Sequence, residues 1–332
     1  MGLSWTPGEA EGRAAAAFDA AREDYERDGV AHVRGVITED ELERLRHSVA
    51  AQMAGASTSK SSYDFEAMQR QAFSGEDGLV DVGESERFDL ELLRFIVETD
   101  PDARPLRDPL PEGRLPSGRF FHDAAGWRFH DGIRDVAFNS RLPRLATHLM
   151  GTSRTHFWED TTFVKAPLTP QRTVFHQDWS YFQIMGEQCC IIWIPLDPVG
   201  AENGRMEYIR GSHRWGQTYA PSIFFAQSAS PVSPYEKLPD IEGNRSAYDI
   251  VSFDCEPGDV IVHHVMTIHG SGGNCSTDRD RRALSFRYCG DDIRYFDKPG
   301  AIEQQYTQTS PRNGDRLNTH DYPLVWPEVS WT

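Results

Sequence analysis

The sequence predicts a mainly β fold with α-helices, in which N-terminal helices precede a β-sandwich or barrel. Apolar residues have helical spacing in several stretches of the first 150 residues. From about Thr155, short runs rich in Val, Ile, Phe, Trp and Thr replace this pattern. No linker separates the two parts. We therefore expect a single domain over 1–332, with mainly helical elements in 1–150, a β core in 151–290 and an extended tail in 291–332.

The first predicted elements are helix, strand and helix. Ala10–Arg27 is rich in alanine with interspersed charges, which favours a helix. Val30–Val33 is mostly apolar and predicts a short strand. Thr38 and Glu41 have the spacing of a capping box, so we expect a second helix to start there and to run to about residue 53.

The next hundred residues are less regular. Gly55–Ser62 is polar and predicts a mobile loop or lid, as does the region Phe120–Phe129. Glu91–Glu98 predicts a short helix, and the proline-rich segment Pro101–Gly118 predicts irregular chain. Gly132–Leu149 predicts helix with a break and a restart near its proline.

The β core is predicted from short runs that Pro, Gly, Asn and Asp separate. Turn signals between runs of this length are typical of a sandwich or barrel. The runs are His156–Val164, Val174–Phe175, Cys189–Pro195, Arg205–Ile209, Asp249–Phe253, Asp259–His264 and Ala283–Tyr288.

Charge and cysteine content restrict the class of protein. With 34 basic and 51 acidic residues, the net charge is −17, which repels phosphate backbones and anionic lipids. We expect neither nucleic acid nor membrane as a partner, and no apolar run has the length of a membrane span. The five cysteines form no CxxC pair, which fits free thiols and a cytoplasmic location. The sequence predicts no oligomeric state.

One short motif indicates a metal site. His176 and Asp178 belong to the sequence's one H-x-D triplet. Residues i and i+2 of a strand point to the same side, so both side chains can reach one metal ion. Ferrous oxygenases combine two histidines with one carboxylate, so a second histidine must come from elsewhere. We favour His269, which we expect at the end of the apolar strand that starts at Val260 and which glycine-rich sequence follows. His263 has the same strand parity and remains an alternative.

Two adjacent arginines open the last predicted strand. A dicarboxylate that chelates a metal at one end needs a cation at the other, and the planar guanidinium suits a carboxylate. Alternation places Arg281, Ser285 and Arg287 on one face of this strand and Arg282 on the other. An exposed arginine pair that flanks a strand is the alternative interpretation.

Taken together, these motifs resemble the phytanoyl-CoA dioxygenase family. The resemblance runs from Tyr25 to Trp326 and includes the H-x-D triplet, Trp193–Asp197, Glu202–His213 and the arginine pair. It implies a double-stranded β-helix core, a jelly roll like that of the cupins, flanked by N-terminal helices.

The resemblance also implies the cofactors and their ligands. These are Fe(II) bound by His176, Asp178 and His269, with 2-oxoglutarate as co-substrate and O2 as oxidant. Arg281 holds the position that pairs with the far carboxylate of 2-oxoglutarate, with Arg282 as the fallback. Trp193 and Ser285 are the other residues expected to bind the co-substrate.

The implied activity is hydroxylation of a small-molecule substrate with release of succinate and CO2. Family halogenases lack the carboxylate ligand, so the presence of Asp178 favours hydroxylation. Desaturation, epimerisation and ring formation use the same ligands and stay open, as does the choice between a free metabolite and an acyl-CoA. Two other classes remain, namely a cupin-like isomerase or lyase without 2-oxoglutarate and a non-catalytic β-sandwich binding protein.

Several further residues are candidates near the site. Trp179, Tyr181 and Phe182 either line the substrate side or pack in the barrel core. We interpret Lys165 as a surface lysine whose stem lies along the protein rather than as a site residue. An acidic group of the substrate has three candidate partners, which are Arg119, Arg128 and Arg287.

Overall fold

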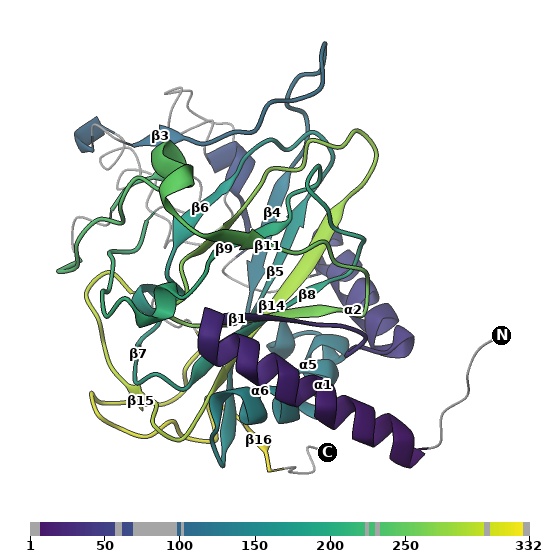
Figure 1. Ribbon diagram of the computed structural model, residues 1–332, viewed down its shortest axis with the longest axis vertical. Helices are drawn as coiled ribbons and strands as arrows, with labels where there is room; N and C mark the ends of the chain where they lie inside the picture. The colour runs from purple at the N-terminus through teal and green to yellow at the C-terminus, as the bar shows by residue number, and fades with distance from the viewer. Residues whose placement is uncertain are drawn as a thin grey trace.

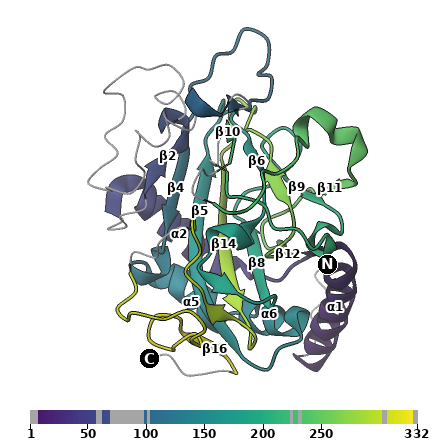
Figure 2. The same cartoon turned by 90° about the vertical axis from the view of Figure 1, so that its left-hand side faces the viewer.

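Eight strands from both ends of the chain form one large antiparallel sheet at the centre of the fold (Figures 1 and 2). The computed structural model describes residues 7–56, 62–68, 98–100, 103–222, 226–229, 233–301 and 306–327. The order in the large sheet is β1-β12-β8-β14-β5-β4-β2, and β16 also pairs with β5. These strands are β1 (Val30–Val33), β2 (Tyr63–Asp64), β4 (Phe120–Ala124), β5 (Thr155–Lys165), β8 (Cys189–Pro195), β12 (Val260–His264), β14 (Arg281–Cys289) and β16 (Leu324–Trp326).

A small antiparallel sheet packs against one face of the large sheet. Its order is β11-β9-β13-β6, and Tyr208 of the small sheet packs in one buried cluster with Trp193 and Ala283 of the large sheet. Two further pairs, β3 with β10 and β7 with β15, lie outside these sheets. The bounds are β6 (Thr173–His176), β9 (Met206–Ile209), β11 (Ile250–Ser252), β13 (His269–Ser271), β3 (Arg104–Pro105), β10 (Ala226–Gln227), β7 (Ile184–Met185) and β15 (Arg294–Tyr295).

Helices cover the opposite face of the large sheet. In Figure 1, α1, α5 and α6 lie together below the sheets. The apolar sides of the helices, such as Leu45 and Leu145, pack with Leu284 and Phe286 of the sheet in one buried core. The helices are α1 (Pro7–Asp28), α2 (Glu39–Ala51), α5 (Asp131–Asn139) and α6 (Leu142–Met150), with short 3-10 turns at Gly126–Arg128, Asp178–Tyr181, Ser212–Arg214 and Glu242–Ala247 and a π turn at Gln52–Ala56.

Strand β14 shows why the two faces differ in chemistry. Its side chains alternate, as the sequence predicts, so that Leu284 and Phe286 face the helices while Ala283 faces the small sheet. Arg281, Ser285 and Arg287 share the parity of Ala283 and are buried. The large sheet therefore presents polar groups to the space between the sheets and apolar groups to the helices.

Most predicted elements are present with small changes of bounds. The capping box of Thr38 and Glu41 begins α2, and the break near Pro143 separates α5 from α6. Residues 57–61 and most of the predicted helix Glu91–Glu98 lie outside the described residues. Division into a single domain stays a prediction. None of the helices in the described part is both long and apolar enough to cross a bilayer.

Two expectations about the fold were wrong. Phe120–Ala124, predicted as a lid or loop, is strand β4 in the large sheet, because pairing with β5 buries its aromatic side chains. The tail is mostly loop within the described residues, and it also contributes β16, which pairs with β5. His269 does not end the strand that starts at Val260. That strand stops at His264, and the chain then crosses to the small sheet.

The capping box provides a test of the local folding argument. Replacing Thr38 with Ala removes the side-chain oxygen that accepts from the Glu41 backbone N–H, so we expect a loss of about 1 kcal/mol in the free energy of unfolding. Thr38→Ser keeps that oxygen and should lose much less. Urea denaturation measures both, and equal losses in the two variants would contradict the argument.

Candidate functional site

His176, Asp178 and His269 meet between the two sheets. β6 ends at His176 and β13 begins at His269, and the two histidines are direct partners in the strand register. Nε2 of His176 lies 3.4 Å from Oδ1 of Asp178, and Nε2 of His269 lies 3.9 Å from the same oxygen. One ligand atom from each residue lies within 4.8 Å of the others, and all three residues are buried. The structure thus brings together the three residues that the sequence singled out.

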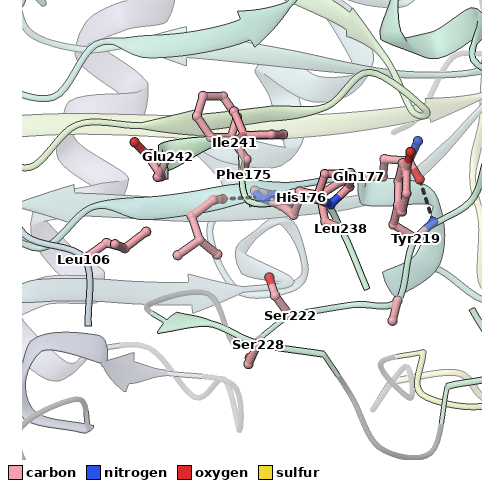
Figure 3. A pocket seen from close by; sticks show the side chains of 13 residues that line it. Leu106, Phe175, His176, Gln177, Tyr219, Ser222, Ser228, Leu238, Ile241 and Glu242 are labelled. Carbon is pink, nitrogen blue, oxygen red and sulfur yellow. Dashed lines mark hydrogen bonds between the residues drawn. The ribbon is translucent and has the colours of Figure 1, made fainter. Parts of the chain in front are cut away.

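Backbone carbonyls set the orientation of both rings. Nδ1 of His176 lies 2.8 Å from the carbonyl of Val174, the bond drawn as a dashed line in Figure 3. Nδ1 of His269 lies 2.9 Å from the carbonyl of Thr267. A ring that donates from Nδ1 keeps its lone pair on Nε2, the nitrogen directed toward Asp178. Both imidazoles are therefore oriented as metal ligands.

The charges around the cluster favour its ligand forms. Burial by itself would raise the pKa of the Asp178 carboxyl, but the imidazoles of His269, His176 and His263 outweigh that effect and lower the pKa well below its usual range. Burial and the neighbouring imidazoles lower the pKa of His269. A carboxylate beside a neutral imidazole is the combination that binds a divalent cation.

His263, the alternative ligand, also lies at this cluster. Its Nε2 is 3.5 Å from Oδ2 of Asp178, and its ring centroid is 4.2 Å from that of His269. Unlike the other two histidines, it has no hydrogen-bond partner among the described residues at either ring nitrogen. It is also absent from the group of ligand atoms that share one centre. The geometry therefore favours His269 over His263.

Arg281 lies buried on the inward face of β14. Its Nη2 and Nε donate to the carbonyl of Gly204 at 2.9 and 3.2 Å, and its guanidinium lies 5.3 Å from the centroid of the Trp193 ring. It forms no ion pair with a carboxylate of the described residues, and burial lowers its pKa to about 10. A buried cation without an anion is a binding site for one. Ser285 lies four residues further along the same face of β14, paired with Trp193 in the register.

The backbone at Gly204 allows this contact. Its φ of +86° is a conformation that side chains rarely adopt, and a Cβ there would lie 2.8 Å from the carbonyl of Gly272. Arg282, the fallback, points to the other face. Its Nη2 pairs with Asp197 at 2.6 Å, so it is already neutralised.

Lys165 corrects one expectation. Predicted as a surface lysine, it is fully buried, because β5 places it opposite Arg281 in the register. Its ammonium donates to Ser271 and to the carbonyls of Gln171 and Gly272 at 2.8 to 3.1 Å. Burial, then the charge of Arg281, lowers its pKa well below the usual lysine value.

Tyr208 is a site residue that the sequence analysis missed. Its ring stacks on His269 with centroids 5.8 Å apart, and its buried hydroxyl has no partner among the described residues. Burial raises its pKa, Cys255 and Asp178 raise it further, and the charge of Arg281 lowers it. The sequence signal was a tyrosine in the strand before Gly211, and strand parity alone did not distinguish it from core.

The aromatic residues after the triplet pack around the site. The Tyr181 hydroxyl donates to the carbonyl of Ser222 at 2.8 Å. The guanidinium of Arg287 lies over the ring of Phe182, 5.1 Å from its centroid. Lys298 from the tail covers Trp179. Its Nζ lies 3.0 Å from the centroid of the indole ring and donates to the Trp179 carbonyl at 2.5 Å.

A pocket adjoins His176 (Figure 3). Its walls are mixed, and the polar side chains among them belong to His176, Gln177, Tyr219, Ser222, Ser228 and Glu242. Gln177 anchors one side by accepting from the backbone N–H of Tyr219 at 3.0 Å. A narrow cavity therefore lies beside the cluster. Residues that line it include Leu106, Phe175, Ser222, Ser228, Ile241 and Glu242.

The cluster between the two antiparallel sheets offers two histidines and one carboxylate, which is the donor set of a known class of metal site. The chain belongs to the phytanoyl-CoA dioxygenase family, whose profile matches residues 25–283. The family resemblance in the sequence is thereby confirmed.

Relatives and solved structures extend this finding. The chain is 28% identical over 208 residues to a probable alpha-ketoglutarate-dependent hypophosphite dioxygenase from Stutzerimonas stutzeri, which covers 59% of this chain and 68% of that protein. It is 27% identical over 176 residues to a probable phytanoyl-CoA dioxygenase from Caenorhabditis elegans. That match covers 52% of this chain and 52% of the relative, so the chain spans about half of the relative's length.

Among solved structures, the fold is similar to that of the epimerase SnoN from nogalamycin biosynthesis. The complex of SnoN with Fe3+, alpha ketoglutarate and nogalamycin RO has a TM-score of 0.62 at 20% identity, and the match covers 94% of this chain and 99% of SnoN. The cofactors expected from the sequence, iron and 2-oxoglutarate, are those named for these proteins.

The choice between the two histidines can be tested by iron binding. Replacing His269 with Ala removes one of the three donors. Loss of a residue that only hydrogen-bonds to a ligand lowers metal affinity by about 10- to 100-fold, so loss of a ligand should lower the Fe(II) affinity by more than that. His263→Ala should retain most of the affinity. Anaerobic titration with Fe(II) measures both, and the reverse order would show that His263 is the ligand.

Lys298 should make the free energy of unfolding depend on pH, in a direction that follows from its pKa. Burial lowers its pKa to about 6, so between pH 6 and 10 the unfolded state binds a proton that the folded state lacks. Stability should therefore rise with pH across this range, by up to about 1.4 kcal/mol per unit from this group.

The matching variant is Lys298→Met. It should be more stable than the parent at pH 7, and its free energy of unfolding should rise less between pH 7 and 9. Urea denaturation at both pH values measures the difference. Parallel profiles for parent and variant would mean that Lys298 keeps an ordinary pKa.

Proposed function

We propose that this protein is an Fe(II)- and 2-oxoglutarate-dependent dioxygenase that hydroxylates a small molecule and releases succinate and CO2. The observation that carries this proposal is the pairing of a buried His-Asp-His cluster with a buried, unneutralised Arg281 on the facing sheet. We further propose that the two sheets form the double-stranded β-helix expected of the family.

The cluster fits a ferrous ion. Two Nε2 atoms and one carboxylate oxygen converge on one point, and carbonyl contacts at Nδ1 prepare both rings for binding. His176, Asp178 and His269 would hold the metal and leave coordination positions open for co-substrate and oxygen. Iron, when bound, supplies the activation of O2 and the oxidative cleavage of the keto acid.

Arg281 fits the remote carboxylate of 2-oxoglutarate. Its guanidinium is held in place by the Gly204 carbonyl and by the Trp193 ring, so little conformational entropy is lost when the carboxylate arrives. Ser285, on the same face of β14 and paired with Trp193, offers a hydroxyl further along the strand. Tyr208, whose ring stacks on His269, offers a further donor, because its buried hydroxyl has no partner among the described residues.

The proposal favours hydroxylation over other outcomes at the same iron. Asp178 occupies the position that halogenases of the family leave open for halide. SnoN, however, is an epimerase, so the product must be examined directly. A mass increase of one oxygen atom, with label from 18O2, supports hydroxylation. An unchanged mass with inverted configuration would instead indicate epimerisation.

Two simpler classes explain fewer observations. A cupin-like isomerase or lyase needs the metal ligands but not Arg281, and a binding protein needs neither. The substrate is proposed to be a free small molecule, because a net charge of −17 disfavours large polyphosphate groups such as that of coenzyme A. All five cysteines are free thiols, which agrees with the proposed cytoplasmic location.

Arginine variants test the co-substrate site. Arg281→Met should raise the KM for 2-oxoglutarate by about 10- to 100-fold, because charge-assisted hydrogen bonds are lost. Arg282→Met removes the neighbouring, already paired guanidinium and should change KM by less than about twofold. Succinate formation with Fe(II) and 2-oxoglutarate is the assay. No succinate from the parent enzyme would refute the proposed function, and a larger effect at Arg282 would refute the assignment of Arg281.

A further inference from the structure

A second buried arginine lies on the inward face of β14. Arg287 is 7% exposed, and its Nη1 donates to Oγ1 of Thr161 at 2.6 Å. Its buried Nε has no partner within the described part of the chain. No described carboxylate forms an ion pair with it. Most of its donor capacity is therefore unused, although the group is removed from water.

The strand register places Arg287 level with the metal cluster. Arg287 pairs with Ile191 of β8, and Ile191 pairs with His263 of β12. His263 in turn lies 3.5 Å from Asp178. Two strand spacings amount to about 10 Å, a distance that a small molecule bridges. Arg281 lies six residues earlier on β14, about 20 Å along the strand, at the end assigned to 2-oxoglutarate.

The surroundings of Arg287 are apolar. Its guanidinium lies 5.1 Å from the centroid of the Phe182 ring. Phe182, Ile191 and Tyr181 belong to one buried hydrophobic cluster. A cation in such surroundings is costly unless an anion accompanies it. Glu159 lies opposite Arg287 in the strand register, and the charge of Arg287 acts on Asp160. Among the described residues neither carboxylate forms an ion pair with the guanidinium, so a bound molecule can supply the direct partner.

The other two arginines suggested by the sequence are already engaged. The side chain of Arg119 is 49% exposed, with its Nε 3.3 Å from Asp64. Arg128 lies 4.2 Å from the centroid of the Trp127 ring and donates to the carbonyl of Asp321 at 3.2 Å. Of the three, only Arg287 combines burial with free donors on the inward face.

We propose that Arg287 binds a carboxylate of the substrate, so that the enzyme acts on a small organic acid with an apolar body. This inference rests on the proposed function and adds the substrate class. A single guanidinium neutralises a carboxylate but leaves a phosphate dianion half compensated, and the apolar cluster disfavours the remaining charge. Because the net charge of −17 repels anions at long range, recognition of an acid requires such a local cation.

The test compares acids with their uncharged amides. Phenylacetate and hexanoate are the acid probes, phenylacetamide and hexanamide are their neutral partners, and phenyl phosphate is the dianion. Binding is followed in the anaerobic Fe(II)–2-oxoglutarate enzyme by the change in its visible charge-transfer absorption. We expect each acid to bind at least about tenfold more tightly than its amide, a difference of about 1.4 kcal/mol, and phenyl phosphate to bind more weakly than the acids.

Variants assign the preference to one residue. Arg287→Met should remove the acid preference without lowering the affinity for 2-oxoglutarate, and Arg287→Lys should retain part of it. Arg119→Met removes an exposed guanidinium that also lies over a phenylalanine ring and should leave the preference intact. Circular dichroism of each variant checks folding, and the comparison of acid with amide in the parent enzyme tests the proposal without any variant.

Several outcomes would overturn the proposal. Acids and amides that bind the parent equally, or an acid preference that survives in Arg287→Met, would show that Arg287 does not select the substrate. Loss of 2-oxoglutarate affinity in Arg287→Met would place the residue in the co-substrate site. If Arg287→Met were less stable but kept the acid preference, Arg287 would instead serve to hold β14 to β5 through its hydrogen bond to Thr161. Failure of the proposed function itself is distinct, because the parent would then form no succinate from 2-oxoglutarate.

Discussion

The antiparallel pairing of β6 with β13 is the constraint on which the site depends. It sets His176 directly opposite His269, and each ring then donates to the carbonyl two residues before it. The same local contact on two neighbouring strands orients both imidazoles toward Asp178. Shifting the register by one residue would turn one ring to the other face of the sheet. Metal chemistry at this position is therefore a property of strand pairing as much as of residue type.

The space between the sheets is basic although the protein is acidic. Arg281, Lys165 and Arg287 are all buried there, while the net charge of the chain is −17. Burial of this kind reduces stability unless anions compensate it. A keto acid at one end and an acidic substrate at the other would supply two of them. If both ligands bind, they would restore the stability that burial of these groups costs, so ligand binding and folding would be coupled.

Sequence reasoning predicted the site better than the fold around it. The alternation along β14 follows from a period of two residues, and the capping box of Thr38 from a spacing of three residues, which are both local. The H-x-D triplet was found by its residue types, since β6 ends at His176 and Asp178 begins a 3-10 turn rather than continuing the expected strand. Lys165 and Tyr208 could not be assigned, because their burial depends on which strand lies opposite them. β13 was missed because three residues with two small side chains carry no periodic signal, and the crossing after His264 is fixed by tertiary packing.

The order of strands in the large sheet has a consequence for folding. β1 pairs with β12, more than two hundred residues later in the chain, and β14 completes the centre of the same sheet. Sheets built from such distant segments form slowly, because long loops must close before their strands can pair. The inward face that carries Arg281 and Trp193 is therefore assembled late in folding, after the helices, whose contacts are local.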